Sequence, residues 1–434
     1  MRRGLILAAA CAAATVAAVA GVQTAAARHE ASPAAAGSTC ALQSADSRIK
    51  HVIYIQFDNT HLLRDNPNVP SDLEQMPNLY NFLKSDGTLL NKQYTVLISH
   101  TAGGILSSLT GLYPDRTGTT VSNSYDYYKP DLTPTFSSAF KYWTGPVNSP
   151  NDLLPNMVNG DSGQAKNTPA PWVSYTRAGC DVGNVSVANT VLENNGTFAG
   201  GDVANVYGNP SPEASESAGL RTTDFVGIAV HCGGAPSSVC ASSSHAKSDP
   251  LPDEPGGYVG YQALFGAKYV DPAITGGQPC VNSTDGTPIT DPSGNCGFPG
   301  FDGMSAANTL GYVAQMQESG VPVTYAYISD VHDNHAGGGA YGPGEAGYVA
   351  ALKSYDDAFG TFFSRLAADG IDKSNTLFVF TADENDHYAG QQAQGCNGVT
   401  TPCVYNTVST NPKHGVYDVT NGATAASSPS TWTG

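Results

Sequence analysis

The chain has 434 residues and a formal net charge of −17, with 20 Lys and Arg against 37 Asp and Glu. This length accommodates one large domain, or a domain that carries an insertion. The charge argues against a surface for nucleic acid or anionic membranes, because such surfaces need clustered Lys and Arg. An anionic small-molecule substrate would therefore have to be held by metal ions rather than by a basic patch.

Residues 1–27 have the pattern of a secretory signal peptide. Arg2 and Arg3 precede an uncharged run from Gly4 to Val22, and Ala25-Ala26-Ala27 offers a cleavage site. We therefore expect a secreted protein with an N-terminal extension over residues 28–50 and no stable membrane anchor after cleavage. A retained anchor is the alternative, but the alanine-rich run is only weakly apolar for a membrane span.

The cysteine count agrees with export. Nine Cys are present, and Cys11 leaves with the signal peptide, so eight remain in the mature chain. An even number of Cys in an exported chain indicates disulfides, and none of the C-x-x-C spacing typical of a thiolate metal site occurs. Three expected disulfides join cysteines close in sequence, namely Cys232–Cys240, Cys280–Cys296 and Cys396–Cys403. The fourth, Cys40–Cys180, joins distant residues.

Regular elements are predicted in two blocks, separated by a long irregular stretch. The first block contains an apolar strand, a helix, a second strand and a short helix. The stretch from about residue 125 to 305 is rich in Gly, Pro, Ser, Asn and Asp, which predicts a loop-rich cap insertion. The second block contains a strand, a long amphipathic helix and another strand. The elements of the two blocks are His51–Phe57, Pro77–Asp86, Tyr94–Ile98 and Ala102–Leu109, then Val321–Ile328, Gly344–Asp369 and Thr376–Thr381.

A strand, a long helix and a second strand in succession form a unit whose strands pair in parallel. We therefore expect an α/β fold with a mostly parallel central sheet flanked by helices. After Glu384 the sequence is typical of loops, and no closing element precedes Gly434. We expect the natural chain to continue beyond this point.

Polar residues follow three of the predicted strands, and Thr101 opens a predicted helix. In an open α/β sheet, the carboxyl ends of parallel strands and the N-termini of helices converge on one crevice. Carboxylate, amide and imidazole groups there suit a divalent cation, and a hydroxyl beside them suits a nucleophile. The candidate metal ligands at these strand ends are Asp58, Asn59, Asp330, His332, His335, Asp383, Glu384 and His387.

Each motif also has an ordinary structural interpretation. Asp58-Asn59 fits an Asx turn after a strand, and Thr101 fits a helix N-cap. The stretch from Asp330 to His335 fits a polar loop equally well. The stretch from Asp383 to His387 favours a functional site most, because it places four ionisable groups within five residues at a strand end.

The stretch from Thr101 to Gly118 resembles the nucleophile region of the alkaline phosphatase superfamily. Thr101 lies nine residues before Thr110 of a T-G-x-Y-P motif, as in the nucleotide pyrophosphatase/phosphodiesterase branch. Thr117 stands where that branch has His. Asp58 and Thr381-Ala-Asp383 resemble two of the family's metal-ligand strand ends, and Asp330 with its nearby His resembles the remaining metal motif.

Two residue pairs at strand ends are similar to a second branch. Asp58-Asn59 and Asp383-Glu384 resemble the acid phosphatases and phospholipase C-type phosphoesterases, which use Glu-Asn early, paired acids late and a Ser nucleophile. The phosphodiesterase branch instead follows the late Asp with His, where this chain has Glu384. The chain is therefore intermediate between the two branches.

The resemblance implies that residues 51–434 form a metal-dependent phosphoesterase for small phosphate mono- or diesters. Thr101 would attack phosphorus in line and form a phospho-threonine, which water would then hydrolyse. It implies one or two divalent ions per chain, with zinc expected first and calcium or another metal as the alternative. A late His ligand is expected before a Gly, and either His414 in Lys413-His414-Gly415 or a residue beyond Gly434 would supply it.

Other functions compete with this one. A sulfatase needs Cys or Ser in a C/S-x-P-x-R motif, which His100-Thr101-Ala102-Gly103-Gly104 lacks. A phospholipase C-like esterase stays open as a more specific form of the same activity. A secreted, non-catalytic binding protein on a degenerate phosphatase fold also stays open, because Gly103-Gly104 stands where the phosphodiesterase branch often has an Asn that holds phosphate.

Overall fold

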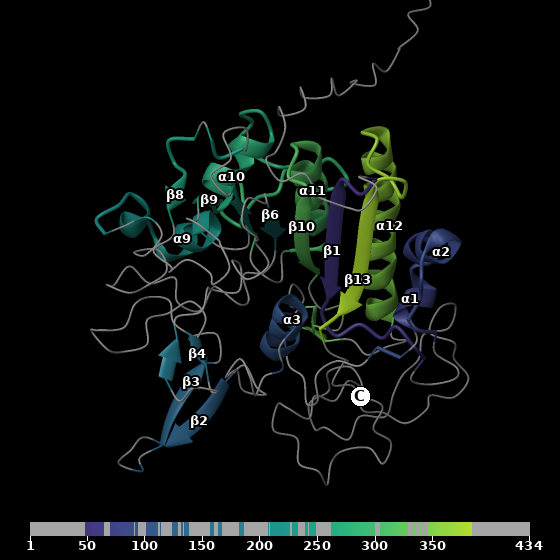
Figure 1. Cartoon of the computed structure of the whole chain (residues 1–434), viewed down its shortest axis with the longest axis horizontal. Coiled ribbons are helices and arrows are strands. Elements are labelled where there is room, and N and C mark those ends of the chain that lie inside the picture. The colour runs from purple at the N-terminus through teal and green to yellow at the C-terminus, as the bar shows by residue number, and fades with distance from the viewer. Residues whose placement is uncertain are drawn as a thin grey trace, which may run out of the picture.

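The computed structural model describes about half of the chain, including most of the central sheet and the helices that cover it (Figure 1). The described residues are 48–64, 70–90, 92–93, 101–111, 113, 124–128, 132, 134–138, 157–159, 164–166, 182–185, 207, 209–225, 228–232, 239–241, 243–248, 262–299, 304–328, 331, 333–334, 339–340 and 346–383.

A seven-stranded sheet organises this part of the chain, with the strand order β13-β1-β10-β6-β7-β9-β8. The four strands from β13 to β6 pair in parallel, and the pairs from β6 to β8 are antiparallel. The α/β class is therefore confirmed, whereas the expectation of a mostly parallel sheet is wrong because the sheet is mixed. The strands are β1 His51–Phe57, β6 Val182–Val185, β7 Ile228–His231, β8 Lys247–Ser248, β9 Gln262–Phe265, β10 Val323–Ile328 and β13 Thr376–Ala382.

The antiparallel half of the sheet has a simple origin in the sequence. Strands β6 to β9 come from residues 182–265, inside the stretch expected to form a loop-rich cap. They are two to four residues long and lie among Gly and Ser, so they carry little periodic signal. Part of that stretch is thus built into the central sheet. Within the described residues, three two-stranded ribbons join β2 Ser124–Tyr128 to β3 Pro134–Ser138, β4 Met157–Asn159 to β5 Gln164–Lys166, and β11 Asp333–Asn334 to β12 Gly339–Ala340.

Alternate side chains of β1 face two different layers. Ile53, Ile55 and Phe57 are buried in the main core, where the Phe57 ring lies 5.8 Å from the ring of Phe359. The residues between them face the opposite side, where Tyr54 packs in a second apolar cluster. This alternation is what a strand buried on both faces requires.

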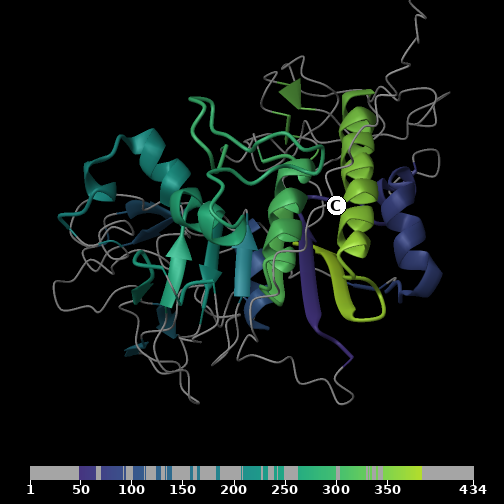
Figure 2. The same ribbon diagram turned by 90° about the horizontal axis from the view of Figure 1, so that it is seen from above.

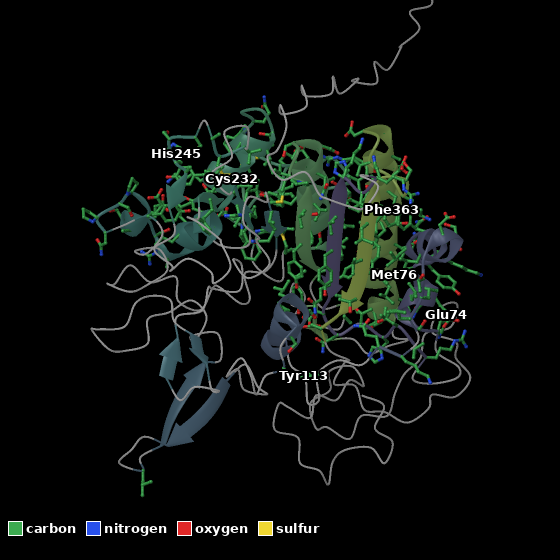
Figure 3. All side chains as sticks on the ribbon, in the orientation of Figure 1. Glu74, Met76, Tyr113, Cys232, His245 and Phe363 are labelled. Carbon is green, nitrogen blue, oxygen red and sulfur yellow. A yellow bond between two sulfur atoms is a disulfide. The ribbon has the colours of Figure 1, made fainter. Side chains whose placement is uncertain are left out.

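Helices cover both faces. The main core lies under α11 Ala306–Glu318 and α12 Ala346–Ala368, and α2 Pro77–Asp86 packs on α12 (Figure 2). The Phe82 ring of α2 stacks at 3.7 Å on Phe363, which Figure 3 labels on α12. The opposite face of β1 and β10 carries α3 Thr101–Thr110. The remaining described helices are the short α1 Asp72–Gln75 and, beside the antiparallel strands, η2 Glu213–Ser215, α9 Ala218–Phe225 and α10 Ala267–Ile274.

Several expectations for single elements are confirmed. β1 and α2 have the predicted bounds, and α12 ends before Gly370, whose φ of 75° favours glycine. The predicted strand Tyr94–Ile98 lies outside the described residues. Among the helices that the structure describes, none is long and apolar enough to cross a membrane.

Two of the expected disulfides are present. Cys232 and Cys240 have Cα atoms 5.7 Å apart (Figure 3), and Cys280 and Cys296 have Cα atoms 5.0 Å apart. Both separations are normal for a disulfide. The other four Cys, at positions 40, 180, 396 and 403, lie outside the described residues, so their pairing stays a prediction.

A fully buried carboxyl group lies between α10 and α11. Asp271 is 0% exposed; its Oδ2 accepts hydrogen bonds from Val281 N at 3.1 Å and from the Tyr312 hydroxyl at 3.1 Å. Within the described residues its Oδ1 has no hydrogen-bond partner. Burial raises the pKa of Asp271 from 3.8 to about 7. The folded protein therefore binds this proton more tightly than the unfolded chain does.

This raised pKa predicts that the free energy of unfolding depends on pH, and that Asp271→Asn weakens this dependence. The stabilisation from the protonated Asp271 is complete below about pH 4 and is lost as the pH rises through about 7. Over this range the free energy of unfolding of the wild type should therefore fall by roughly 2–4 kcal/mol more than that of the variant. Burial also raises the pKa of Asp224 to about 7, so only the difference between wild type and variant isolates Asp271. Urea unfolding between pH 4.5 and 8 measures it. Parallel profiles for the two proteins would contradict the shift.

Candidate functional site

Asp58 and Asp383 lie next to each other at the carboxyl edge of the sheet. Phe57 of β1 pairs with Ala382 of β13, and the next residue of each strand continues the ladder. Asp383 N donates to Phe57 O at 3.1 Å, and Asp58 N donates to Ile328 O of β10 at 3.0 Å. Residues that pair in register point to the same face of a parallel sheet. Because side chains alternate along β1, we expect the side chains of both aspartates to lie on the face of the sheet that α3 covers.

Asp383 is held in a buried polar contact. Its side chain is 1% exposed, and the hydroxyl of Tyr327 on β10 donates to Oδ2 at 3.1 Å. Tyr327 is itself 1% exposed and belongs to the cluster of Ile105 and Tyr325 under α3. This contact occupies one oxygen of the carboxylate and fixes its orientation.

Helix α3 approaches Asp383 with its first turn. A Cβ atom on Gly104 would lie 2.3 Å from the carbonyl oxygen of Asp383 and 2.9 Å from its Cβ, so only glycine permits this backbone contact. One turn later, Ser108 Oγ accepts a hydrogen bond from Gln56 Nε2 at 3.0 Å, further back along β1. The helix therefore runs from the carboxyl edge toward the middle of the sheet. Figure 1 shows α3 beside the arrowhead of β13.

This direction puts the N-terminus of α3 at the carboxyl edge. Thr101 is the first helical residue, three positions before Gly104, and its side chain lies outside the described set. The free N–H groups and the dipole at a helix N-terminus favour an anion. The two aspartates beside them favour a cation. The carboxyl edge therefore favours an anion at the N-terminus of α3 and a cation at the two aspartates.

The donor chemistry at the edge fits a divalent cation. Asp58 and Asp383 would supply carboxylate oxygens and Asn59 would supply an amide oxygen, which hard cations prefer. Asn59 is 3% exposed and has a φ of 45°, a left-handed conformation that Asn tolerates better than most residues. The amide is therefore held inside the protein directly after Asp58.

The remaining predicted ligands lie outside the described residues. Among the described residues, no group of three His, Cys, Asp or Glu side chains could hold a metal ion. Strand β10, which precedes one set of these candidates, ends at the same edge, because Ile328 pairs with Phe57. The candidates outside the described residues are Asp330, His332, His335, Glu384, His387 and His414.

A second buried polar group near the end of β1 was not predicted. His61 is 5% exposed, and its backbone N–H donates to Asp72 Oδ2 at 2.7 Å. The hydroxyl of Tyr348 on α12 donates to the same oxygen at 2.6 Å. The capping box of Ser71 and Glu74, which starts α1, is the sequence signal that would have located Asp72. These contacts anchor the segment that leaves Asp58 to α12.

Comparisons of this chain with protein-family models, with curated proteins and with solved structures find no match. The functional interpretation therefore rests on the residues at the carboxyl edge and on their geometry. That geometry consists of two adjacent aspartates, a buried amide and a helix N-terminus that reaches the same edge of the sheet.

Proposed function

We propose that this chain is a secreted, metal-dependent phosphoesterase that hydrolyses phosphate mono- or diesters with Thr101 as its nucleophile. The observation that supports this most is the approach of α3 to Asp383, where a Cβ on Gly104 would lie 2.3 Å from the Asp383 carbonyl oxygen. A hydroxyl at the start of this helix would stand beside the aspartates that end β1 and β13. The resemblance of Thr101–Gly118 to the alkaline phosphatase superfamily points to the same chemistry.

The electrostatics explain why a metal is needed. A phosphate group at this edge would meet the N–H groups of α3, which favour it, and the carboxylates of Asp58 and Asp383, which repel it. A divalent ion held by Asp58, Asn59 and Asp383, with ligands from the segments after β10 and β13, would reverse that repulsion. When bound, such an ion neutralises phosphate charge and lowers the pKa of water or of a hydroxyl. We propose that the ion is zinc, with one or two ions per chain.

The reaction has two displacements. In the first, a bond forms between Thr101 Oγ1 and phosphorus while the bond between phosphorus and the ester oxygen breaks, and the Thr101 proton passes in net to the ester oxygen, which leaves as the alcohol. In the second, water attacks phosphorus, the bond between phosphorus and Thr101 Oγ1 breaks, and one proton of the water returns to Thr101 Oγ1; the product released is phosphate from a monoester, or a phosphate monoester from a diester. The N–H groups at the start of α3 would bind the phosphoryl oxygens through both steps.

Metal content and turnover of purified mature protein test this function. We expect bound divalent metal and hydrolysis of p-nitrophenyl phosphate or of bis(p-nitrophenyl) phosphate. Asp383→Asn should lose both, because a ligand charge is removed. Wild-type protein without metal and without turnover of either ester would favour the non-catalytic binding protein.

A matched control is Asp356→Asn on α12. Asp356 is also buried, at 5% exposed, but its Oδ1 accepts a hydrogen bond from Asn78 N at 2.7 Å and so joins the first turn of α2 to α12, on the face of the sheet opposite α3. This variant should lower the melting temperature and keep metal content and turnover. Equal losses of metal in both aspartate variants would mean that the loss reflects unfolding.

A further inference from the structure

Gln56 is a buried amide in a mostly apolar strand. It is 0% exposed and lies on the face of β1 that carries α3, among Tyr325 and Tyr327 of β10 and Ile105 of α3. A buried amide without partners would destabilise the fold. Its hydrogen bonds therefore determine what it does there.

Those bonds form a chain from the sheet to α3. The Tyr325 hydroxyl donates to Gln56 Oε1 at 2.7 Å, and Gln56 Nε2 donates to Ser108 Oγ at 3.0 Å. Ser108 Oγ donates in turn to the carbonyl of Gly104 at 2.9 Å. Burial raises the pKa of Tyr54 on the same face, and a hydrogen bond to Ser108 opposes the rise. The chain thus ends at the residue whose backbone touches Asp383.

Apolar packing alone would fix the position of α3 along the sheet less specifically than the hydrogen bonds do. Ile105 and Leu109 contact the tyrosines of the sheet, and such contacts tolerate small shifts of a helix along its axis. A chain of hydrogen bonds has fixed donors and acceptors, so it is satisfied in one register only. Fixing Ser108 over Gln56 also fixes where the first turn of α3 stands.

We propose that Gln56 is a positioning residue, which sets the register of α3 on the sheet and so the reach of Thr101 toward the carboxyl edge. The part that concerns Thr101 rests on the proposed phosphoesterase function. The part that concerns the register of α3 rests only on the contacts described above. The competing interpretation is a polar network that contributes stability and nothing else.

Gln56→Met tests the proposal, because methionine has a similar shape and cannot join the chain. We expect kcat for whichever p-nitrophenyl ester the wild-type protein hydrolyses to fall about 10- to 100-fold, with KM changed by no more than about twofold. Backbone amides of residues 105–110, which hydrogen-bond within α3, should exchange hydrogen about tenfold faster, while those of β1 and β10 do not change. Ser108→Ala should have a similar effect, and the double variant should be no worse than Gln56→Met alone.

Gln317→Met is the matched control. Gln317 is 2% exposed and ties α11 to the other face of the sheet, where its Nε2 donates to Val52 O at 3.1 Å and to Thr324 Oγ1 at 3.0 Å. This variant should lower the melting temperature without changing kcat or exchange in α3.

The outcomes separate the two proposals. Unchanged exchange in α3 in Gln56→Met, or a loss of kcat that matches the loss in folded protein, would overturn the positioning role. If the wild-type protein hydrolyses no phosphate ester, the proposed function fails. The exchange measurement then decides alone whether Gln56 sets the register of α3.

Discussion

Thr101→Ala should retain its fold and bound metal and lose nearly all hydrolysis, by about three orders of magnitude or more. The reason is that the nucleophilic oxygen is absent, whereas Asp58, Asn59 and Asp383 are unchanged. Thr101→Ser should keep part of the activity because it keeps a hydroxyl. Turnover, metal content and melting temperature of both variants check this expectation.

If Thr101 has only a structural role at the start of α3, the same variants should give different results. If the side chain only caps α3, its removal would lower stability by about 1 kcal/mol and leave turnover unchanged. The serine variant would then resemble wild type in every measurement. A fully active Thr101→Ala protein would therefore remove Thr101 from the chemistry.

Gly104→Ala should damage both the fold and the site. The added Cβ would lie 2.3 Å from the carbonyl oxygen of Asp383 and 2.8 Å from its carbonyl carbon. These are backbone atoms of a buried strand end, which cannot rotate away, so α3 has to move. We expect a loss of roughly 1–3 kcal/mol in stability and, in the protein that still folds, a fall in kcat of about 100-fold. Urea unfolding and turnover measured on the same samples separate the two effects.

Gly219→Ala controls for the substitution itself. Gly219 is also helical, in α9, and a Cβ there would have no heavy atom within 4 Å. Alanine should stabilise this helix by about 0.5–1 kcal/mol and leave turnover unchanged. If Gly104→Ala behaved like Gly219→Ala, the close approach of α3 to Asp383 would be wrong.

Elements with strong local signals were predictable from the sequence. The β-branched and aromatic run of β1 and the apolar stripe of α12 gave their type and nearly their bounds. Pro77 at the start of α2 and Gly370 after α12 marked the ends of helices. In each case the information lies within a few residues of the element.

The features that were missed depend on distant contacts or weak periodicity. Ser305 caps the N-terminus of α11, where its side chain accepts a hydrogen bond from Asn308 N, but the apolar residues of the helix are mixed with Gly, Asn and Gln. Strands β6, β7 and β9 are short, and only their pairing in one sheet defines them. Local pattern alone therefore could not show that the sheet is mixed.

The candidate site divides in the same way. The sequence placed Asp58 and Asp383 at strand ends, and the parallel register makes them neighbours. The contact of Gly104 with Asp383 and the hydrogen bond from Tyr327 join residues far apart in the chain. Neither follows from spacing, because both require the register of three strands and one helix.

A trapped phospho-threonine would test the central claim most directly. Wild-type protein would be mixed with whichever of p-nitrophenyl phosphate and bis(p-nitrophenyl) phosphate it hydrolyses, quenched in acid during turnover, digested and sequenced by mass spectrometry. We expect one phosphoryl group on Thr101 in the quenched sample and none in protein quenched without substrate. Turnover with an unmodified Thr101, or a phosphoryl group on another residue, would contradict the assignment of Thr101 as the nucleophile.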